Sequence, residues 1–295
     1  MNILHMTSWL HTRAKPKSKS EEGPKVRDYF LNLESGDFAT YYLSLFNAYV
    51  YSTANNRSLN IYDRANPVSV SYPLLKEAFE PVANVNYVSE MMTGVTILSG
   101  QSDQRYAGFL TRLSKEELRA AALRVLKWSS SILEKVAETL REQGLETPEQ
   151  AASFDVGVHI RPRNRFDAVR APNAASYVTS VEDVGRRLKR TDLSVFVLTS
   201  ELADFIEFQR AAPPTWKLFQ VQPSSATIRG SNVGSFNRQN SAIKLNAYTE
   251  HVSELYCMQH CDTIIGSLTT NIGRFLYLTA PDPNAFRSID TQVYS

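Results

Sequence analysis

The sequence predicts an α/β protein with two Rossmann-like domains that face each other across a cleft. Short apolar segments alternate with helical segments along both halves, a pattern typical of parallel strands joined by crossover helices. The later strands are apolar almost throughout, as expected for a sheet that is covered on both faces. Gly144 and Pro148 end the helix that separates the halves, which predicts domains at residues 1–150 and 151–295.

The elements of the first half follow from its apolar patterns. Its predicted strands are the short apolar stretches at residues 1–6, 58–63 and 95–98. Apolar residues crowd all sides of the segment 38–51, which predicts a buried helix. A reciprocal capping pair, Ser114 and Glu117, begins a further helix. Because apolar residues then recur at three- and four-residue spacing as far as Leu140, we expect one long helix here.

The second half repeats the alternation more regularly. Its predicted strands lie at residues 154–160, 194–200, 216–221 and 263–266. Its predicted helices lie at residues 177–189, 201–210, 249–259 and 270–278. Crossovers of one hand make such a chain a doubly wound sheet, and ligands of these sheets bind beyond the carboxyl ends of the strands. The residues that directly follow each strand are therefore the candidates for a binding site.

Composition and charge exclude several classes of protein. The 32 basic and 30 acidic residues nearly cancel, to a net charge of +2, so we expect no nucleic-acid partner. No run of about 18 apolar residues is present, and therefore no membrane span is expected. The first residues lack the basic lead and the apolar core of a signal peptide, which predicts a cytoplasmic location. Two cysteines are too few for a disulfide framework.

A basic cluster follows the first strand of the second half. His159 and Arg161 point to the same side of an extended chain, because side chains alternate along a strand. The guanidinium of Arg161 suits a diphosphate, since its planar fork pairs with two phosphate oxygens. The alternative is a basic cluster on an exposed loop. The strongly apolar strand before the cluster favours the anion site.

Small and hydroxyl-bearing residues follow the last predicted strand. The sequence Gly266-Ser267-Leu268-Thr269-Thr270-Asn271 leads directly into a predicted helix. Backbone amides and hydroxyl groups at the start of a helix can bind an anion. The alternative is ordinary N-capping of the helix by Thr269 or Thr270. Because the basic cluster is expected at the same edge of the sheet, the two segments favour one shared anion site.

Both segments resemble motifs of one enzyme superfamily. His159-Ile160-Arg161 after a strand is similar to the His-x-Arg motif of the α1,6-fucosyltransferases and protein O-fucosyltransferases. Further segments resemble that superfamily in the same order, namely Phe196-Val197-Leu198-Thr199-Ser200-Glu201, the stretch from Cys261 to Arg274, and Phe286-Arg287-Ser288-Ile289-Asp290. The resemblance spans about 140 residues. It implies the GT-B fold, and the transfer of fucose from GDP-fucose.

The resemblance also implies roles for individual residues. Arg161 would bind the β-phosphate of the donor and stabilise the leaving diphosphate, and His159 would help to hold the nucleotide. Glu254, placed by its spacing to Asp262, would read the edge of guanine, although the family usually has Asp there. The alternative for Glu254 is a carboxylate on a solvated helix face. The implied donor-binding set is His159, Arg161, Glu254, Ser267, Thr269, Thr270, Asn271 and Arg274.

The chain also departs from that superfamily. Pro162 stands where the α1,6 enzymes have a second Arg, so their acceptor contacts do not carry over. The first half shows little agreement with the family's motifs. No Asp-x-Asp occurs, so we expect no divalent metal at the diphosphate. Cys257, His260 and Cys261 would supply only three ligands, whereas a structural zinc usually has four, and buried thiols are expected instead.

These observations predict an inverting, metal-independent glycosyltransferase with no cofactor besides its donor substrate. It would transfer a sugar, expected to be fucose from GDP-fucose, to a hydroxyl of a glycan or other acceptor held mainly by the first domain. Asp167 is the candidate general base, with Asp37 and Asp63 as alternatives from the first domain. The other interpretation of Asp167 is a plain loop aspartate without a catalytic role. Two other functions stay open: a transferase with another donor, such as UDP-xylose or a rhamnose donor, and a non-catalytic nucleotide-sugar-binding protein.

Overall fold

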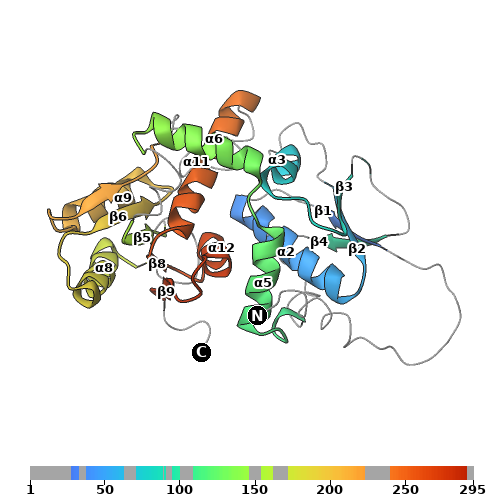
Figure 1. Ribbon diagram of the computed structural model, residues 1–295, viewed down its shortest axis with the longest axis horizontal. Helices are drawn as coiled ribbons and strands as arrows, with labels where there is room; N and C mark the ends of the chain where they lie inside the picture. Colours follow the sequence, from blue (N-terminus) through green and yellow to red (C-terminus); the bar gives the residue numbers. More distant parts are fainter. Residues whose placement is uncertain are drawn as a thin grey trace, which may run out of the picture. The chain divides into compact units, whose positions relative to one another are not determined.

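A computed structural model of the 295-residue chain gives the fold of both halves (Figure 1). It describes residues 28–32, 38–62, 71–88, 90, 95–99, 109–145, 154–161, 172–222 and 240–290. The chain divides into two compact units, Met1–Ser129 and Ser130–Ser295. Each unit has its own parallel sheet, which confirms the predicted α/β class. Among the described residues, none of the helices has the length and the apolar character that a membrane span requires.

The sheet of the first unit has the strand order β3-β2-β1-β4, and all neighbouring strands are parallel. Its strands are β1 (Asp28–Asn32), β2 (Ser58–Tyr62), β3 (Val85–Tyr87) and β4 (Thr96–Ser99). Its described helices are α2 (Phe38–Ala54), α3 (Ser71–Ala78) and α5 (Lys115–Val125). α2 is buried along most of its length, as its dense apolar residues predicted.

β1 is a strand that the apolar pattern did not predict. Its buried apolar run is short. Phe30 and Leu31 are buried, whereas Asp28 and Tyr29 are partly exposed. A run of this length carries no clear periodicity. Pairing with β2 on one side and β4 on the other places it in the interior of the sheet. The strand predicted at residues 1–6 lies outside the described residues.

The single helix predicted from Ser114 to Leu140 was wrong, because the chain forms two helices there, α5 and α6 (Ser130–Glu142). The predicted capping box at the start of α5 is confirmed. Between the helices, Trp128 forms an antiparallel bridge with Phe79, and the Ser129 N–H donates to the Ala78 carbonyl at 2.8 Å. These contacts with the last residue of α3 and the residue after it take the place of helical hydrogen bonds.

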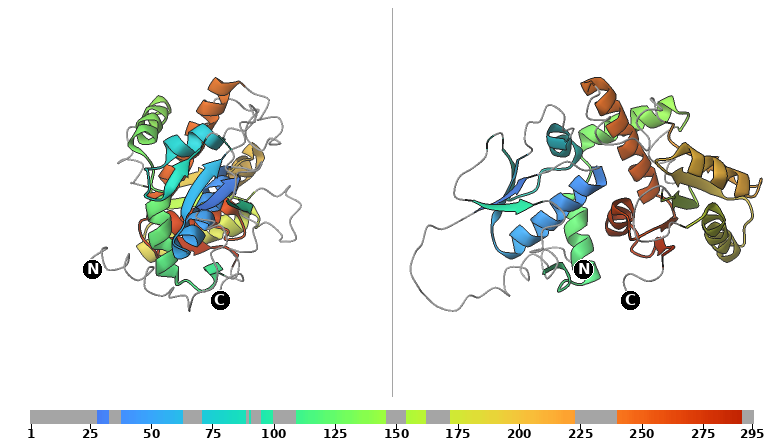
Figure 2. Two further views of the ribbon diagram at one scale, coloured as in Figure 1. Left: turned by 90° about the vertical axis from the view of Figure 1, so that its right-hand side faces the viewer. Right: turned by 180° about the vertical axis from the view of Figure 1, so that it is seen from behind.

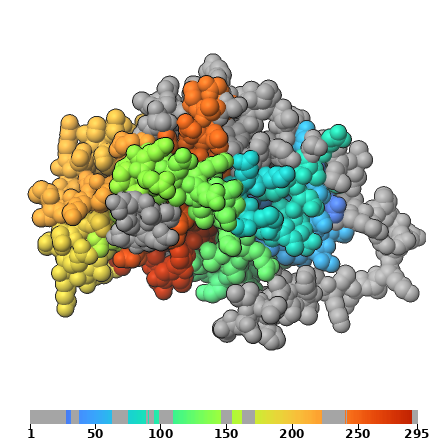
Figure 3. Space-filling model, turned by 45° about the horizontal axis from the view of Figure 1, so that its top comes forward, coloured from blue at the N-terminus to red at the C-terminus, as the bar shows by residue number. Residues whose placement is uncertain are grey.

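α6 lies against α11 (Ser241–Gln259) in the second unit (Figure 3). The buried residues of α6 are Ile132, Val136 and Leu140. Just beyond α6, the Gln143 side chain forms two hydrogen bonds with the main chain of Gln222, at 2.8 and 2.6 Å. For these reasons the boundary between the units falls after Ser129, upstream of the position that Gly144 and Pro148 indicated.

The sheet of the second unit has the order β7-β6-β5-β8-β9, again with parallel neighbours. Its strands are β5 (Val156–His159), β6 (Ser194–Leu198), β7 (Lys217–Phe219), β8 (Thr263–Gly266) and β9 (Phe286–Ser288). The other helices of this unit are α8 (Ala174–Leu188), α9 (Leu202–Ala211) and α12 (Asn271–Thr279). The predicted elements are confirmed, except that α11 begins at Ser241 rather than Thr249, and β9 was not predicted.

The chain leaves β5 in two directions, which makes the sheet doubly wound. It first runs through α8 and α9 to β6 and β7, then returns through α11 to β8 and through α12 to β9. α8 and α9 contact each other and share a core with Val156 and Val158, whereas Gly157 faces Met258 and Cys261. Because side chains alternate along β5, α8 and α9 cover one face of the sheet, and α11 and α12 cover the other (Figure 2, yellow and orange-red).

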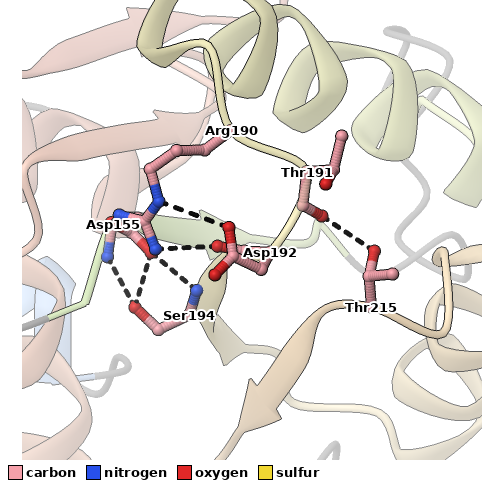
Figure 4. Close-up of polar contacts among 6 residues, drawn as sticks. All are labelled: Asp155, Arg190, Thr191, Asp192, Ser194 and Thr215. Atoms are coloured by element: carbon pink, nitrogen blue, oxygen red, sulfur yellow. Dashed lines mark hydrogen bonds and ion pairs between the residues drawn. The ribbon is translucent and has the colours of Figure 1, made fainter.

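At the amino edge of this sheet, Asp155 ties the start of β5 to β6 (Figure 4). Its carboxylate accepts hydrogen bonds from the Ser194 N–H at 2.7 Å, the Ser194 hydroxyl at 2.8 Å and Arg190 at 2.6 Å. The Asp155 N–H donates back to the Ser194 hydroxyl at 3.0 Å. Because the Asp155 side chain is only 10% exposed, these charge-assisted hydrogen bonds are well protected from water.

We expect Asp155→Asn to lower the free energy of unfolding by about 1–3 kcal/mol. Arg190 and Ser194 donate hydrogen bonds to both carboxylate oxygens, and the amide NH2 of Asn cannot accept the bonds made to one of these oxygens. Urea unfolding followed by circular dichroism measures this loss. Asp192→Asn is the matched control, since Asp192 approaches Arg190 at 3.5 Å but its side chain is 79% exposed. The control should change stability by less than about 0.5 kcal/mol. Equal stabilities of Asp155→Asn and the parent protein would show that the hydrogen bonds of Asp155 with Ser194 and Arg190 do not stabilise the fold.

Candidate functional site

The carboxyl edge of the second sheet brings two of the predicted segments together. β5 lies next to both β6 and β8, and the chain reaches these two neighbours by crossovers in opposite directions. In open α/β sheets, ligands bind at this topological switch point, where the loops after the strands diverge. Here β5 leads to Arg161, and β8 leads to the turn Ser267–Thr270 before α12. The two motifs of the sequence therefore flank the switch point.

Arg161 is buried and is held at both its main chain and its side chain. Its N–H donates to the hydroxyl of Tyr177, on α8, at 3.1 Å. Its Nη1 donates to the Thr269 hydroxyl at 2.7 Å, which joins the exits of β5 and β8. Burial raises the pKa of the Tyr177 hydroxyl to about 12, although the hydrogen bond from Arg161 acts in the opposite direction. The phenol therefore stays neutral near pH 7, and it fixes the main chain of Arg161.

His159 lies at the same edge of the sheet, on the face covered by α11. It is buried, and its Cβ is 3.6 Å from the position that a Cβ on Gly266 would occupy. Gly157, two residues earlier, faces Met258 of α11, and side chains alternate along the strand. The structure thus places His159 beside the end of β8, next to the segment that contains Thr269.

The turn after β8 is held closely against α12. The Thr270 hydroxyl accepts a hydrogen bond from the Gly273 N–H at 2.9 Å and donates to the Ser267 carbonyl at 2.8 Å, so Thr270 is the N-cap of α12. Arg274 donates through Nε to the Leu268 carbonyl at 2.9 Å. A Cβ on Gly273 would lie 1.9 Å from the Ser267 carbonyl oxygen, so only glycine fits there. Thr270 and Arg274 therefore shape the turn that presents Thr269.

Asp290, just beyond β9, is a site residue that the sequence reasoning missed. Its carboxylate accepts hydrogen bonds from the N–H groups of Leu268 at 3.2 Å and Thr269 at 3.4 Å. It also accepts from the Ser267 hydroxyl and, at 2.7 Å, from the Ser288 hydroxyl. The sequence predicts that these backbone amides donate to a bound anion, and in this structure they donate to a carboxylate of the chain itself.

Asp290 is held in its ionised form by these donors. Burial alone would raise the pKa of its carboxyl group, but the hydrogen bonds from Ser267, Ser288 and Thr269 together lower that pKa below its usual value. The only sequence signal for Asp290 was the segment Phe286–Asp290, which resembled a family segment but suggested no role. Its position follows from the pairing of β9 with β8, and β9 was not predicted.

The remaining candidates lie at several places. Glu254 is buried on α11, and its carboxylate faces Nδ1 of His251 at 3.8 Å. Asn271 is the first residue of α12. The candidate general base, Asp167, lies outside the described residues, as do its alternatives Asp37 and Asp63.

Cys257, on α11, and Cys261, just beyond the end of this helix, are buried free thiols, as expected. Burial raises the pKa of both Cys257 and Cys261, and the Cys261 thiol donates to the Cys257 carbonyl at 3.2 Å. Within the part of the chain that the structure describes, no group of three or more His, Cys, Asp or Glu side chains is placed to hold a metal ion.

Comparison with known proteins identifies relatives by structure only. No protein-family model matches the sequence, and no curated protein matches it. The NodZ α-1,6-fucosyltransferase soaked with GDP-fucose aligns with a TM-score of 0.52 and 16% identity, over 86% of this chain and 93% of that one. Selenomethionine-labelled fucosyltransferase NodZ from Bradyrhizobium aligns with a TM-score of 0.52 and 15% identity, over the same 86% and 93%.

These alignments extend over both units of the chain, since they cover most of its length. The chain therefore has a fucosyltransferase-like GT-B fold, which confirms the fold that the motifs implied. At 15–16% identity the likeness concerns the fold alone.

Proposed function

We propose that this chain is a glycosyltransferase that transfers a sugar from a nucleoside-diphosphate donor to a hydroxyl acceptor. Fucose and GDP are the proposed sugar and nucleotide. The observation that carries the proposal is Arg161, a buried guanidinium fixed by Thr269 at the switch point of a doubly wound sheet. The NodZ structure of the same fold was soaked with GDP-fucose, which supports this choice of donor.

A guanidinium is well suited to this position. Cleavage of the bond between the sugar and the diphosphate places negative charge on the leaving group. A cation that is already oriented stabilises that charge without reorganisation of the site. The planar fork of Arg161 can bind two phosphate oxygens, which a lysine cannot do. In this proposal the guanidinium does the work of a divalent metal, and the enzyme needs no cofactor.

The proposed reaction is a direct displacement with inversion at the anomeric carbon. The acceptor hydroxyl attacks from the side opposite to the diphosphate, and a carboxylate takes its proton. Asp167, six residues after Arg161, is the proposed base. His159 and Glu254 are proposed to hold the nucleotide, with Glu254 at the guanine edge.

We expect Arg161→Ala to reduce the rate of transfer roughly 30- to 1000-fold, which corresponds to about 2–4 kcal/mol of transition-state stabilisation. Arg161→Lys should also be strongly impaired, because a point charge cannot replace the fork. Initial rates with GDP-fucose measure both effects. Arg210→Ala, at an exposed position on α9, is the control and should keep full activity. Near-parental activity of Arg161→Ala would exclude the assignment.

Activity should persist in excess EDTA, because the proposed partner of the diphosphate is a guanidinium. Rates measured before and after exhaustive treatment with the chelator test this expectation. A complete loss of activity that Mg²⁺ or Mn²⁺ restores would show that a metal binds the leaving group instead.

Glu254→Gln should weaken binding of GDP about tenfold and leave binding of UDP nearly unchanged. A carboxylate accepts hydrogen bonds from both N1 and N2 of guanine, whereas uracil presents one N–H on the corresponding edge. Calorimetry with GDP, UDP and dTDP on the parent and the variant measures the preference. Glu182→Gln, exposed on α8, is the matched control. A preference of the parent for UDP or dTDP would support the alternative donors, and binding without transfer would support a non-catalytic protein.

A further inference from the structure

Two hydroxyl groups connect Asp290 to Arg161. Arg161 Nη1 lies 2.7 Å from the Thr269 hydroxyl oxygen, and that oxygen lies 2.6 Å from the Ser267 hydroxyl oxygen. Ser267 in turn is hydrogen-bonded to Asp290 Oδ2. The chain of contacts starts at a cation, ends at a carboxylate, and passes through the exits of three neighbouring strands, β5, β8 and β9.

The direction of every hydrogen bond in this chain follows from the chemistry of its ends. The ionised Asp290 carboxylate can only accept, so the single hydroxyl hydrogen of Ser267 is donated to it. Ser267 must then accept from Thr269, which uses the only hydroxyl hydrogen of Thr269. The Thr269 oxygen is thereby left as an acceptor, and the guanidinium of Arg161 donates to it. No other arrangement satisfies all of these groups.

We propose that Asp290 is a positioning residue for Arg161, which acts through Ser267 and Thr269; this inference rests on the proposed role of Arg161 in binding the donor diphosphate. The carboxylate fixes which way both hydroxyls point, and so it makes Thr269 an acceptor that orients the guanidinium. Hydrogen bonds in such a chain polarise and strengthen one another.

The two intervening hydroxyls also explain why Asp290 does not pair with Arg161 directly. A carboxylate in contact with the guanidinium would offset the charge that a phosphate has to meet. In this relay, by which we mean the hydrogen bonds from Arg161 through Thr269 and Ser267 to Asp290, a neutral hydroxyl contacts the guanidinium. The carboxylate of Asp290 meanwhile accepts hydrogen bonds from the amides of Leu268 and Thr269. Asp290 thus has two separable actions, one on the main chain of the turn and one on the side chain of Arg161.

Ser267→Ala separates the two actions, because it cuts the relay and leaves the amide contacts of Asp290 in place. We expect it to weaken binding of GDP roughly tenfold while binding of guanosine changes less than about twofold, since only GDP carries a diphosphate for Arg161. Ser180→Ala is the matched control, because that hydroxyl donates to the Ser176 carbonyl within α8. Equal losses for GDP and guanosine would overturn the relay and indicate a general disturbance of the site.

A double-mutant cycle tests whether the carboxylate acts through the hydroxyls. Thr269→Val removes the acceptor of Arg161 and keeps the shape of the side chain. If the relay operates, Ser267→Ala should add less than about twofold to the loss of GDP affinity in the Thr269→Val protein. Asp290→Asn should lower the affinity for GDP more than the affinity for guanosine. That difference should likewise change little when Asp290→Asn is introduced into the Thr269→Val protein. Fully additive losses would overturn the inference.

A measurement without ligand distinguishes failure of the relay from failure of the proposed function. The Nε–H signal of Arg161, assigned in ¹⁵N-arginine spectra by its disappearance in Arg161→Lys, reports the mobility of the guanidinium. Rotation about the guanidinium bonds should be slow in the parent protein and faster in Ser267→Ala. Unchanged rotation overturns the relay. If rotation responds as expected but neither GDP nor UDP binds, the relay stands and the proposed donor site is wrong.

Discussion

The hydrogen bond between Arg161 and Thr269 is the interaction on which the rest of the candidate site depends. It joins residues 108 positions apart in the sequence, and it forms because β5 and β8 are neighbours in a parallel sheet. The pairing places the exits of both strands at one edge, and the helices on the two faces keep these exits in position. Tyr177 fixes Arg161 from α8, and Thr270 and Gly273 fix the turn before α12. Arg161 is therefore held at its main chain by α8 and at its guanidinium by the turn after β8. The proposed stabilisation of a leaving group requires preorganisation of this kind.

The two edges of the second sheet use carboxylates in different ways. At the amino edge, Asp155 accepts directly from Arg190 and from both donors of Ser194, so its charge is matched at short range. At the carboxyl edge, Asp290 binds backbone amides and hydroxyls, and two hydroxyls stand between it and Arg161. A direct pair of carboxylate and guanidinium suits a structural contact, because each charge then compensates the other within the protein. An indirect connection suits a binding site, because the cation must retain its attraction for an anionic ligand.

The sequence was sufficient for the elements with long apolar segments and for the residues that directly follow them. β5 and β8 belong to strongly apolar runs, so their exits, with Arg161 and Thr269, could be located from the amino-acid pattern alone. β1 and β9 could not be predicted because they have too few apolar residues to show a period, and their partners in the sheet determine them. Asp290 was missed for the same reason, since its place beside Ser267 follows from the pairing of β9 with β8. The break between α5 and α6 depends on backbone hydrogen bonds with the distant residues Ala78 and Glu80, which helical periodicity does not reveal.

A crystal structure of the protein with GDP would test the central claim most directly. The account predicts that a β-phosphate oxygen lies about 2.7–3.0 Å from a guanidinium nitrogen of Arg161, with Thr269 still bound to Nη1 and Asp290 still bound to the Leu268 amide. A diphosphate bound at another edge of the sheet, away from Arg161, would contradict the account. A diphosphate bound to the Leu268 and Thr269 amides with Asp290 displaced would contradict it equally, since the carboxylate would then be a substitute for the ligand and not a support for the arginine.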